Sequence, residues 1–172
     1  KEINDNVDLV VWPESSTGFN NDPLLHTDVL RDISNEAERL NSYFLIGGDR
    51  PINSNYFENY GLFINNKGFI VDQYLKQHPV PFGEYIPFRK YLDWIPPLAL
   101  VPRDMIRGTE EKIFHLNETK IATVISFEGS FQRYIRNGVK NGAEIIVILT
   151  NQASYGVSAM SDQFILMSRR SE

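Results

Sequence analysis

Three polar residues of types that can catalyse acyl transfer each follow a predicted β-strand. They are Glu14 after the apolar run 7–11, Lys76 after the run 69–75 and Ser126 after the run 121–125. In layered α/β folds the carboxyl ends of strands share one rim, where functional sites are assembled. On such a rim a carboxylate can take the proton of a nucleophile, and an ammonium can stabilise the oxyanion of a tetrahedral intermediate. The sequence therefore predicts an acyl-transfer site built from these three residues.

Each of the three residues also has a simpler interpretation when it is taken alone. Glu14 could cap a loop or helix, Lys76 could be a solvated lysine, and Ser126 could be the N-cap of a following helix. Polar residues at strand ends are mostly solvated or capping. The catalytic interpretation therefore depends on the three side chains meeting in space.

The apolar pattern predicts strands that alternate with helices. Strands are predicted at 7–11, 43–46, 60–64, 69–75, 112–116, 121–125 and 145–149, and helices at 25–40, at 131–140 and from about Ser161 onward. We expect the first strand to be buried on both faces, the second to end at Gly47-Gly48, and the turn 65–68 to close a hairpin. This order of elements predicts an α/β layered domain with mixed sheets.

Composition excludes several classes of function. The chain has 172 residues, of which 42% are hydrophobic and 23% charged, so it can form one domain with a core. Its net charge of −5 offers no basic surface to nucleic acid. We expect no metal, because His26, His78 and His115 lack ligand spacing, and no cofactor, because no glycine-rich phosphate motif is present. No apolar run approaches the length of a membrane span.

A long stretch without a regular pattern, 78–109, holds six of the nine prolines. Such loops inside a domain are usually functional. Its part 91–102 is apolar, aromatic and proline-rich, and it has two interpretations: a loop packed as a small satellite core, or an arm that reaches a membrane surface or acyl chains. Under the second interpretation Trp94, together with Tyr85 upstream, is a candidate for substrate binding.

Three blocks of the sequence resemble the signature blocks of the nitrilase (carbon–nitrogen hydrolase) superfamily, in the same order. They read Trp-Pro-Glu at 12–14, Lys-Gln-His-Pro-Val-Pro-Phe-Gly-Glu-Tyr-Ile-Pro at 76–87 and Ile-Ser-Phe-Glu at 125–128. The middle block is the most specific, and it is similar to bacterial apolipoprotein N-acyltransferases rather than to general amidases. Residues 150–152, Gln163 and 168–169 are also similar to the family, so the resemblance covers essentially the whole chain.

The resemblance implies a nitrilase-type α-β-β-α sandwich, with residues 1–172 as a partial catalytic domain that is incomplete at both ends. It implies flanking strands and membrane helices outside this chain, in a longer protein. The implied reaction moves an acyl chain from a phospholipid to the N-terminal diacylglyceryl-cysteine of an apolipoprotein, through a covalent acyl-enzyme. The implied location is the bacterial inner membrane, with this domain on the extracytoplasmic side.

The same resemblance assigns roles to individual residues. It makes Glu14 the general base, Lys76 the oxyanion-stabilising cation and position 126 the nucleophile. Three further residues would support the site: Glu84 beside the lysine, and Phe127 and Glu128 just after the nucleophile. A buried lysine next to two carboxylates is expected to stay protonated, which is the state that the oxyanion role needs.

Position 126 departs from the family pattern, which has cysteine there. A serine hydroxyl needs stronger base assistance than a thiol, so we expect Ser126 to lower turnover. Three interpretations stay open: an engineered substitution, a natural serine variant with altered activity, or a domain that binds without turnover. Beside the acyltransferase, the alternative functions are a soluble nitrilase-type amidase that hydrolyses a small amide and a binding domain with an altered nucleophile.

Overall fold

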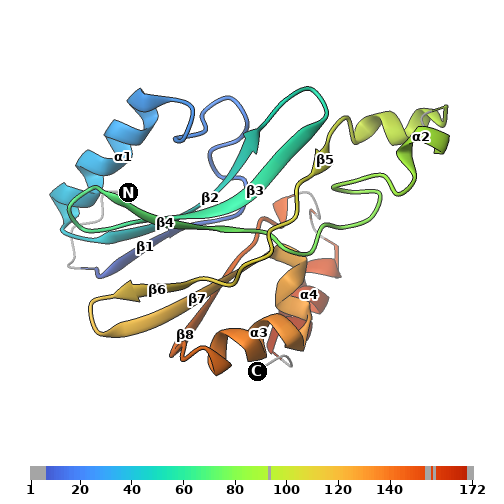
Figure 1. Cartoon of the computed structure of the whole chain (residues 1–172). Helices are drawn as coiled ribbons and strands as arrows, with labels where there is room; N and C mark the ends of the chain where they lie inside the picture. The colour runs from blue at the N-terminus through green and yellow to red at the C-terminus, as the bar shows by residue number, and fades with distance from the viewer. Residues whose placement is uncertain (1–6, 93, 154–155, 157, 170–172) are drawn as a thin grey trace.

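Two β-sheets face each other in the structure, a computed structural model that describes residues 7–92, 94–153, 156 and 158–169 (Figure 1). The first sheet has the strand order β1-β2-β3-β4, and β5 pairs with β3. Its strands are β1 (Leu9–Trp12), β2 (Tyr43–Pro51), β3 (Tyr56–Ile64), β4 (Ile70–Leu75) and β5 (Asp104–Met105). The second sheet has the order β6-β7-β8, with β6 (Ile113–Leu116), β7 (Thr119–Ile125) and β8 (Ile145–Leu149). Parallel and antiparallel pairs occur in both sheets, so both are mixed as predicted.

Helices cover the outer faces of the two sheets and complete four layers. Helix α1 (Thr27–Leu40) lies on the first sheet, and α3 (Gln132–Lys140) lies on the second (Figure 1). The remaining helices are α2 (Arg89–Leu92), α4 (Met160–Arg169) and the 3-10 helices η1 (Pro96–Leu100) and η2 (Ser126–Ser130). Within the described ranges, none of the helices has both the length and the apolar content of a membrane-spanning helix.

The core between the sheets consists of large apolar side chains from both inner faces. These are Leu45, Phe63, Tyr74, Phe114, Ile125 and Leu149. The rings of Phe63 and Phe114 stack across the sheets with centroids 4.7 Å apart. Because strands β4 and β7 both contribute to this core, their carboxyl ends are held against each other. Those ends carry Lys76 and Ser126.

Most predicted elements are confirmed, but two expectations about the first sheet are wrong. The hairpin is confirmed, because β3 and β4 pair antiparallel and Gly68 adopts a left-handed φ of 74° in the turn. Strand β2, however, does not end at Gly47-Gly48 but continues to Pro51. Gly47 is needed inside the strand for close packing, because a Cβ at this position would lie 2.4 Å from the Pro13 carbonyl oxygen. Strand β1 is not buried on both faces, since it is an edge strand and Val11 is 42% exposed.

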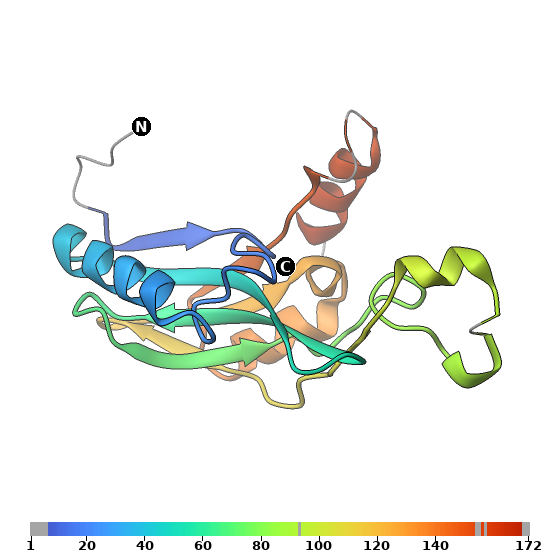
Figure 2. The ribbon, with the colours of Figure 1, turned by 90° about the horizontal axis from the view of Figure 1, so that it is seen from above.

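After the turn 80–85, the proline-rich stretch leaves the body of the molecule as a projecting arm (Figure 2). It was predicted to be irregular throughout, but it contains α2, η1 and β5. The arm exposes large apolar side chains, with Phe88, Tyr91, Trp94 and Leu100 between 64% and 86% exposed. The arm is therefore not packed as a satellite core at these positions.

Candidate active site

A buried lysine between two carboxylates forms the centre of the site. The Lys76 ammonium lies 3.0 Å from Glu14 Oε1 and 2.5 Å from Glu84 Oε1. Lys76 has no exposed surface and Glu14 is 7% exposed. These three residues, called the ion cluster below, come from the end of β1, the end of β4 and the turn 80–85. Glu14 and Glu84, which are 70 positions apart in the sequence, thus contact the same ammonium.

The backbone around Lys76 fixes the direction of its side chain. Its amide donates to the Asn59 carbonyl of β3, and its own carbonyl accepts from Gly108. Gly108 is packed so closely that a Cβ there would lie 2.2 Å from the Leu75 carbonyl oxygen. Burial by itself lowers the pKa of Lys76, but Glu14 and Glu84 act in the opposite direction and hold that pKa above its ordinary value. Lys76 is therefore a permanent cation at neutral pH.

Glu84 is positioned by the tight turn that precedes the arm. The amides of Gly83 and Glu84 both donate to the Val80 carbonyl, and Phe82 adopts a left-handed φ of 62°. The Val80 amide donates back to Glu84 Oε2 at 2.8 Å, while Oε1 faces Lys76. The carboxylate is thus held at both oxygens, which orients it toward the ammonium.

Ser126 lies at a strained junction between β7 and η2. Its φ is 52°, a left-handed conformation that is uncommon for a residue other than glycine. Backbone strain of this kind is concentrated at functional sites, and a sharp strand-to-helix turn is one way to expose a nucleophile. Ser126 lines a pocket of about 640 Å³ together with Glu14 and Glu84, so it shares one cavity with the two carboxylates of the ion cluster.

Glu128 stabilises the junction between β7 and η2 through buried hydrogen bonds. It is fully buried and accepts hydrogen bonds from the Tyr74 hydroxyl and from the amides of Gln77, His78 and Ile125, at 2.5–2.9 Å. Burial raises the pKa of Glu128, and these hydrogen bonds act against that rise. The residue therefore ties the segments that carry Lys76 and Ser126 to each other, two positions from the hydroxyl.

The other three residues predicted for the site lie outside the shared pocket. Phe127 is 37% exposed and packs edge-on against Phe131, with ring centroids 5.1 Å apart. Tyr85 lines a separate pocket of about 270 Å³ with His78 and Arg107. Trp94 is 79% exposed on the arm, where its indole N–H donates to the Tyr91 carbonyl. These side chains do not line the cavity that Glu14, Glu84 and Ser126 share.

Among the polar residues of the pocket that sequence reasoning did not find are Asn59 and Asp49. Asn59 of β3 donates from Nδ2 to Glu14 Oε1 at 2.9 Å, and Asp49 of β2 lines the same wall. Asp49 was missed because β2 was expected to end at Gly47-Gly48. Asn59 was missed because only the cross-strand register, in which it is paired with Asp49, shows that it faces the pocket.

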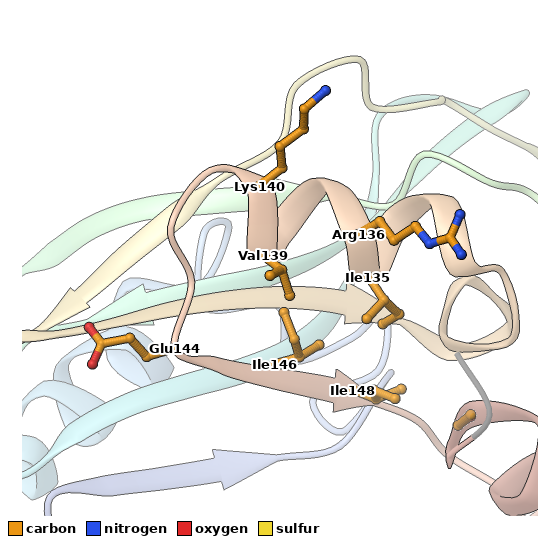
Figure 3. Close-up of a pocket in the computed structure, with 8 residues that line it drawn as sticks. Ile135, Arg136, Val139, Lys140, Glu144, Ile146 and Ile148 are labelled. Carbon is orange, nitrogen blue, oxygen red and sulfur yellow. The ribbon is translucent and has the colours of Figure 1, made fainter. Parts of the chain in front are cut away.

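Taken together, the pocket and the lysine held by two of its lining carboxylates supply groups for nucleophilic acyl chemistry. Glu14 is a carboxylate that can accept a proton, Lys76 is a fixed cation, and Ser126 is a hydroxyl on a strained turn. A second pocket of about 640 Å³ lies between α3 and β8, lined by the apolar side chains Ile135, Val139, Ile146 and Ile148 (Figure 3). That groove lacks the ion cluster, so acyl chemistry is associated with the first pocket.

Bacterial proteins named apolipoprotein N-acyltransferase are similar to this chain in sequence. The protein of Mycolicibacterium smegmatis is 29% identical over 164 residues, which cover 90% of this chain and 26% of that protein. The protein of Aquifex aeolicus is 28% identical over 173 residues, which cover 98% of this chain and 37% of that protein. The chain thus spans well under half the length of either relative.

Solved structures of the nitrilase superfamily are similar in fold. A serine mutant of the Nesterenkonia AN1 amidase matches with a TM-score of 0.60 at 11% identity, over 87% of this chain and 57% of that chain. With the four layers described above, this likeness confirms the predicted α-β-β-α sandwich. The sequence model of the carbon-nitrogen hydrolase family matches residues 1–172. The chain therefore belongs to the carbon-nitrogen hydrolase family.

Proposed function

We propose that this domain catalyses acyl transfer from a phospholipid to the N-terminal amino group of a diacylglyceryl-cysteine, the reaction of an apolipoprotein N-acyltransferase. The observation that carries the proposal is the buried Lys76 between Glu14 and Glu84, two carboxylates that line a pocket together with Ser126. The name shared by the similar bacterial proteins supports the choice of reaction.

In the first half of the proposed reaction, residue 126 takes the acyl chain. Glu14 accepts the hydroxyl proton of Ser126 while Ser126 Oγ bonds to the ester carbonyl carbon. Lys76 stabilises the negative charge that develops on the carbonyl oxygen. The carbon–oxygen bond to the glycerol then breaks, and the lysophospholipid leaves with the proton held by Glu14. The product is an oxyester on Ser126.

In the second half, an amine removes the acyl chain. The nitrogen bonds to the oxyester carbon, Glu14 takes a proton from it, and Lys76 again stabilises the oxyanion. The bond to the Ser126 oxygen breaks, and that oxygen regains a proton from Glu14. We propose that serine slows both halves relative to cysteine, because a hydroxyl is the weaker nucleophile and an oxyester is a less reactive acyl donor than a thioester.

The arm gives the domain a means to contact the lipid that supplies the acyl chain. Its exposed residues include Trp94 and Tyr91, types that favour the boundary between lipid and water. The arm follows the turn that carries Glu84, a residue that lines the pocket. We propose that it lies on the extracytoplasmic membrane surface and guides acyl chains toward residue 126.

The proposed function is tested by the mass of the full-length protein after incubation with phospholipid. We expect an added acyl group on residue 126, formed faster in Ser126→Cys and not formed in Ser126→Ala. The Ser126→Ala control shows that the adduct is specific to this position. If the Ser126 protein and Ser126→Cys hydrolyse small amides but form no acyl adduct from phospholipid, the domain is instead an amidase. Inactivity of both forms would leave a binding domain.

Replacing Lys76 by Met should slow formation of the acyl adduct by about 10²–10³-fold, the usual cost of losing an oxyanion-stabilising group. The matched control is Lys112→Met, because Lys112 is a partly exposed lysine that also pairs with two carboxylates, Asp72 and Glu110. The adduct rate is measured by quenched-flow mass spectrometry, and thermal melting checks that both variants fold. An unchanged rate in a folded Lys76→Met protein would remove Lys76 from the mechanism.

Removing apolar side chains from the arm should weaken binding to membranes. We expect a Trp94→Ser, Leu100→Ser double variant of the 172-residue chain to cosediment less with phospholipid vesicles than the unchanged chain. The control is Ile70→Ser, Val71→Ser, which removes exposed apolar side chains from β4 (41% and 54% exposed) instead of from the arm. Equal losses in the two double variants would mean that the arm has no special affinity for lipid.

A further inference from the structure

Asp49 adds a carboxyl group to the pocket that does not belong to the ion cluster. It lies near the end of β2, is 7% exposed and lines the pocket wall. Ser15 lines the same pocket. The cation next to Asp49 on the strand, Arg50, is paired with Glu58 across the sheet. Asp49 is therefore a carboxylate of the pocket, and the neighbouring Arg50 is paired with Glu58 instead.

Asn59 offers an unused acceptor beside Asp49. The two residues are directly opposite each other on β3 and β2, so their side chains lie on the same face of the sheet. Asn59 is 3% exposed and also lines the pocket. Its Nδ2 is bound to Glu14, but its Oδ1 has no hydrogen-bond partner in the part of the chain that the structure describes. A buried acceptor without a donor is unfavourable, and a donor from a bound molecule would relieve that cost.

The charges of the pocket favour a cationic donor. Glu14, Asp49 and Glu84 all line it, and the single Lys76 ammonium is shared between Glu14 and Glu84. A protonated primary amine carries one positive charge and three N–H donors. It can therefore satisfy both the Asp49 carboxylate and the free Asn59 oxygen. The ester group of an acyl donor is neutral and has no donor to offer.

We infer that Asp49 and Asn59 form the subsite that binds the protonated amino group of the acyl acceptor before transfer. The inference rests on the proposed function and identifies the residues that select an amine as acceptor. Asn59 also touches Glu14, the carboxylate that takes a proton from the amine when its nitrogen attacks the acyl carbon. The bound ammonium first loses one proton to solvent, and the neutral nitrogen then attacks and gives a second proton to the neighbouring Glu14.

The charge of Asp49 makes this subsite sensitive to pH. Burial raises the pKa of Asp49 to about 6; the Ser15 hydrogen bond and Lys76 oppose this rise, and Glu14 and Glu84 add to it. Asp49 is neutral below that pKa and attracts an ammonium only above it. The affinity for the acceptor should therefore increase from about pH 5 to pH 7 and then level off, until the amine itself loses its proton.

The inference is tested with a synthetic S-diacylglyceryl-cysteinyl peptide and its N-acetylated form, which lacks the ammonium. We expect the full-length protein, with Ser126 in place, to bind the free amine at least about tenfold more tightly than the acetylated peptide, and Asp49→Asn to lose this preference and its pH dependence. Asp32→Asn, an exposed acid on α1, is the matched control. Thermal melting checks the fold, and Asp49→Ser replaces the Asn variant if that variant does not fold.

Kinetics separate the inference from the proposed function. In the turnover assay, Asp49→Asn should raise the KM for the acceptor peptide about tenfold and leave the KM for the phospholipid within twofold. If transfer occurs but Asp49→Asn changes neither the acceptor KM nor the preference for the free amine, the subsite is wrong and the proposed function stands. If the amine preference depends on Asp49 but no acyl transfer occurs, the subsite stands and the proposed function is wrong.

Discussion

The site depends on a charge that the fold keeps away from water. Taking an ammonium out of water is costly, and it is tolerated where nearby carboxylates and good geometry compensate. For Lys76 the compensation comes from Glu14 and Glu84, which the chain delivers from the edge strand β1 and from the turn before the arm. Removal of either carboxylate would leave a buried charge with half of its compensation. The ion cluster therefore links three segments of the chain: the ends of β1 and β4, and the turn 80–85.

The second sheet supplies Ser126, the residue on which we propose that the ion cluster acts. Apolar packing between β4 and β7 brings the end of each strand to the same cavity, and Glu128 joins those ends through buried hydrogen bonds. Ser126, in its left-handed turn, lines the pocket that Glu14 and Glu84 also line, and both of these carboxylates contact the Lys76 ammonium. Because Lys76 and its partners are in place before any substrate binds, little reorganisation is needed during the reaction. The same arrangement would serve a thiol at this position.

The sequence predicts the positions of the chemical groups better than their surroundings. Glu14, Lys76 and Ser126 follow strands, and strand ends are recognisable from apolar runs. Asp49 was hidden because two glycines suggest a strand end, whereas here they permit close packing against Pro13 and Tyr60 inside a longer strand. The role of Asn59 depends on cross-strand register, and the distance of Trp94 from the pocket depends on where a proline-rich arm projects. Neither is encoded in local periodicity.

We propose that Lys76 faces the oxygen on which charge develops when residue 126 is acylated. A crystal structure of the protein after reaction with a lipid-like fluorophosphonate tests this directly, because the phosphonyl group on Ser126 mimics the tetrahedral intermediate. We expect one phosphonyl oxygen within hydrogen-bond distance of Lys76 Nζ, about 3 Å, with Glu14 and Glu84 still in contact with the ammonium. A phosphonyl group on Ser126 whose oxygens all point away from Lys76 would contradict the claim.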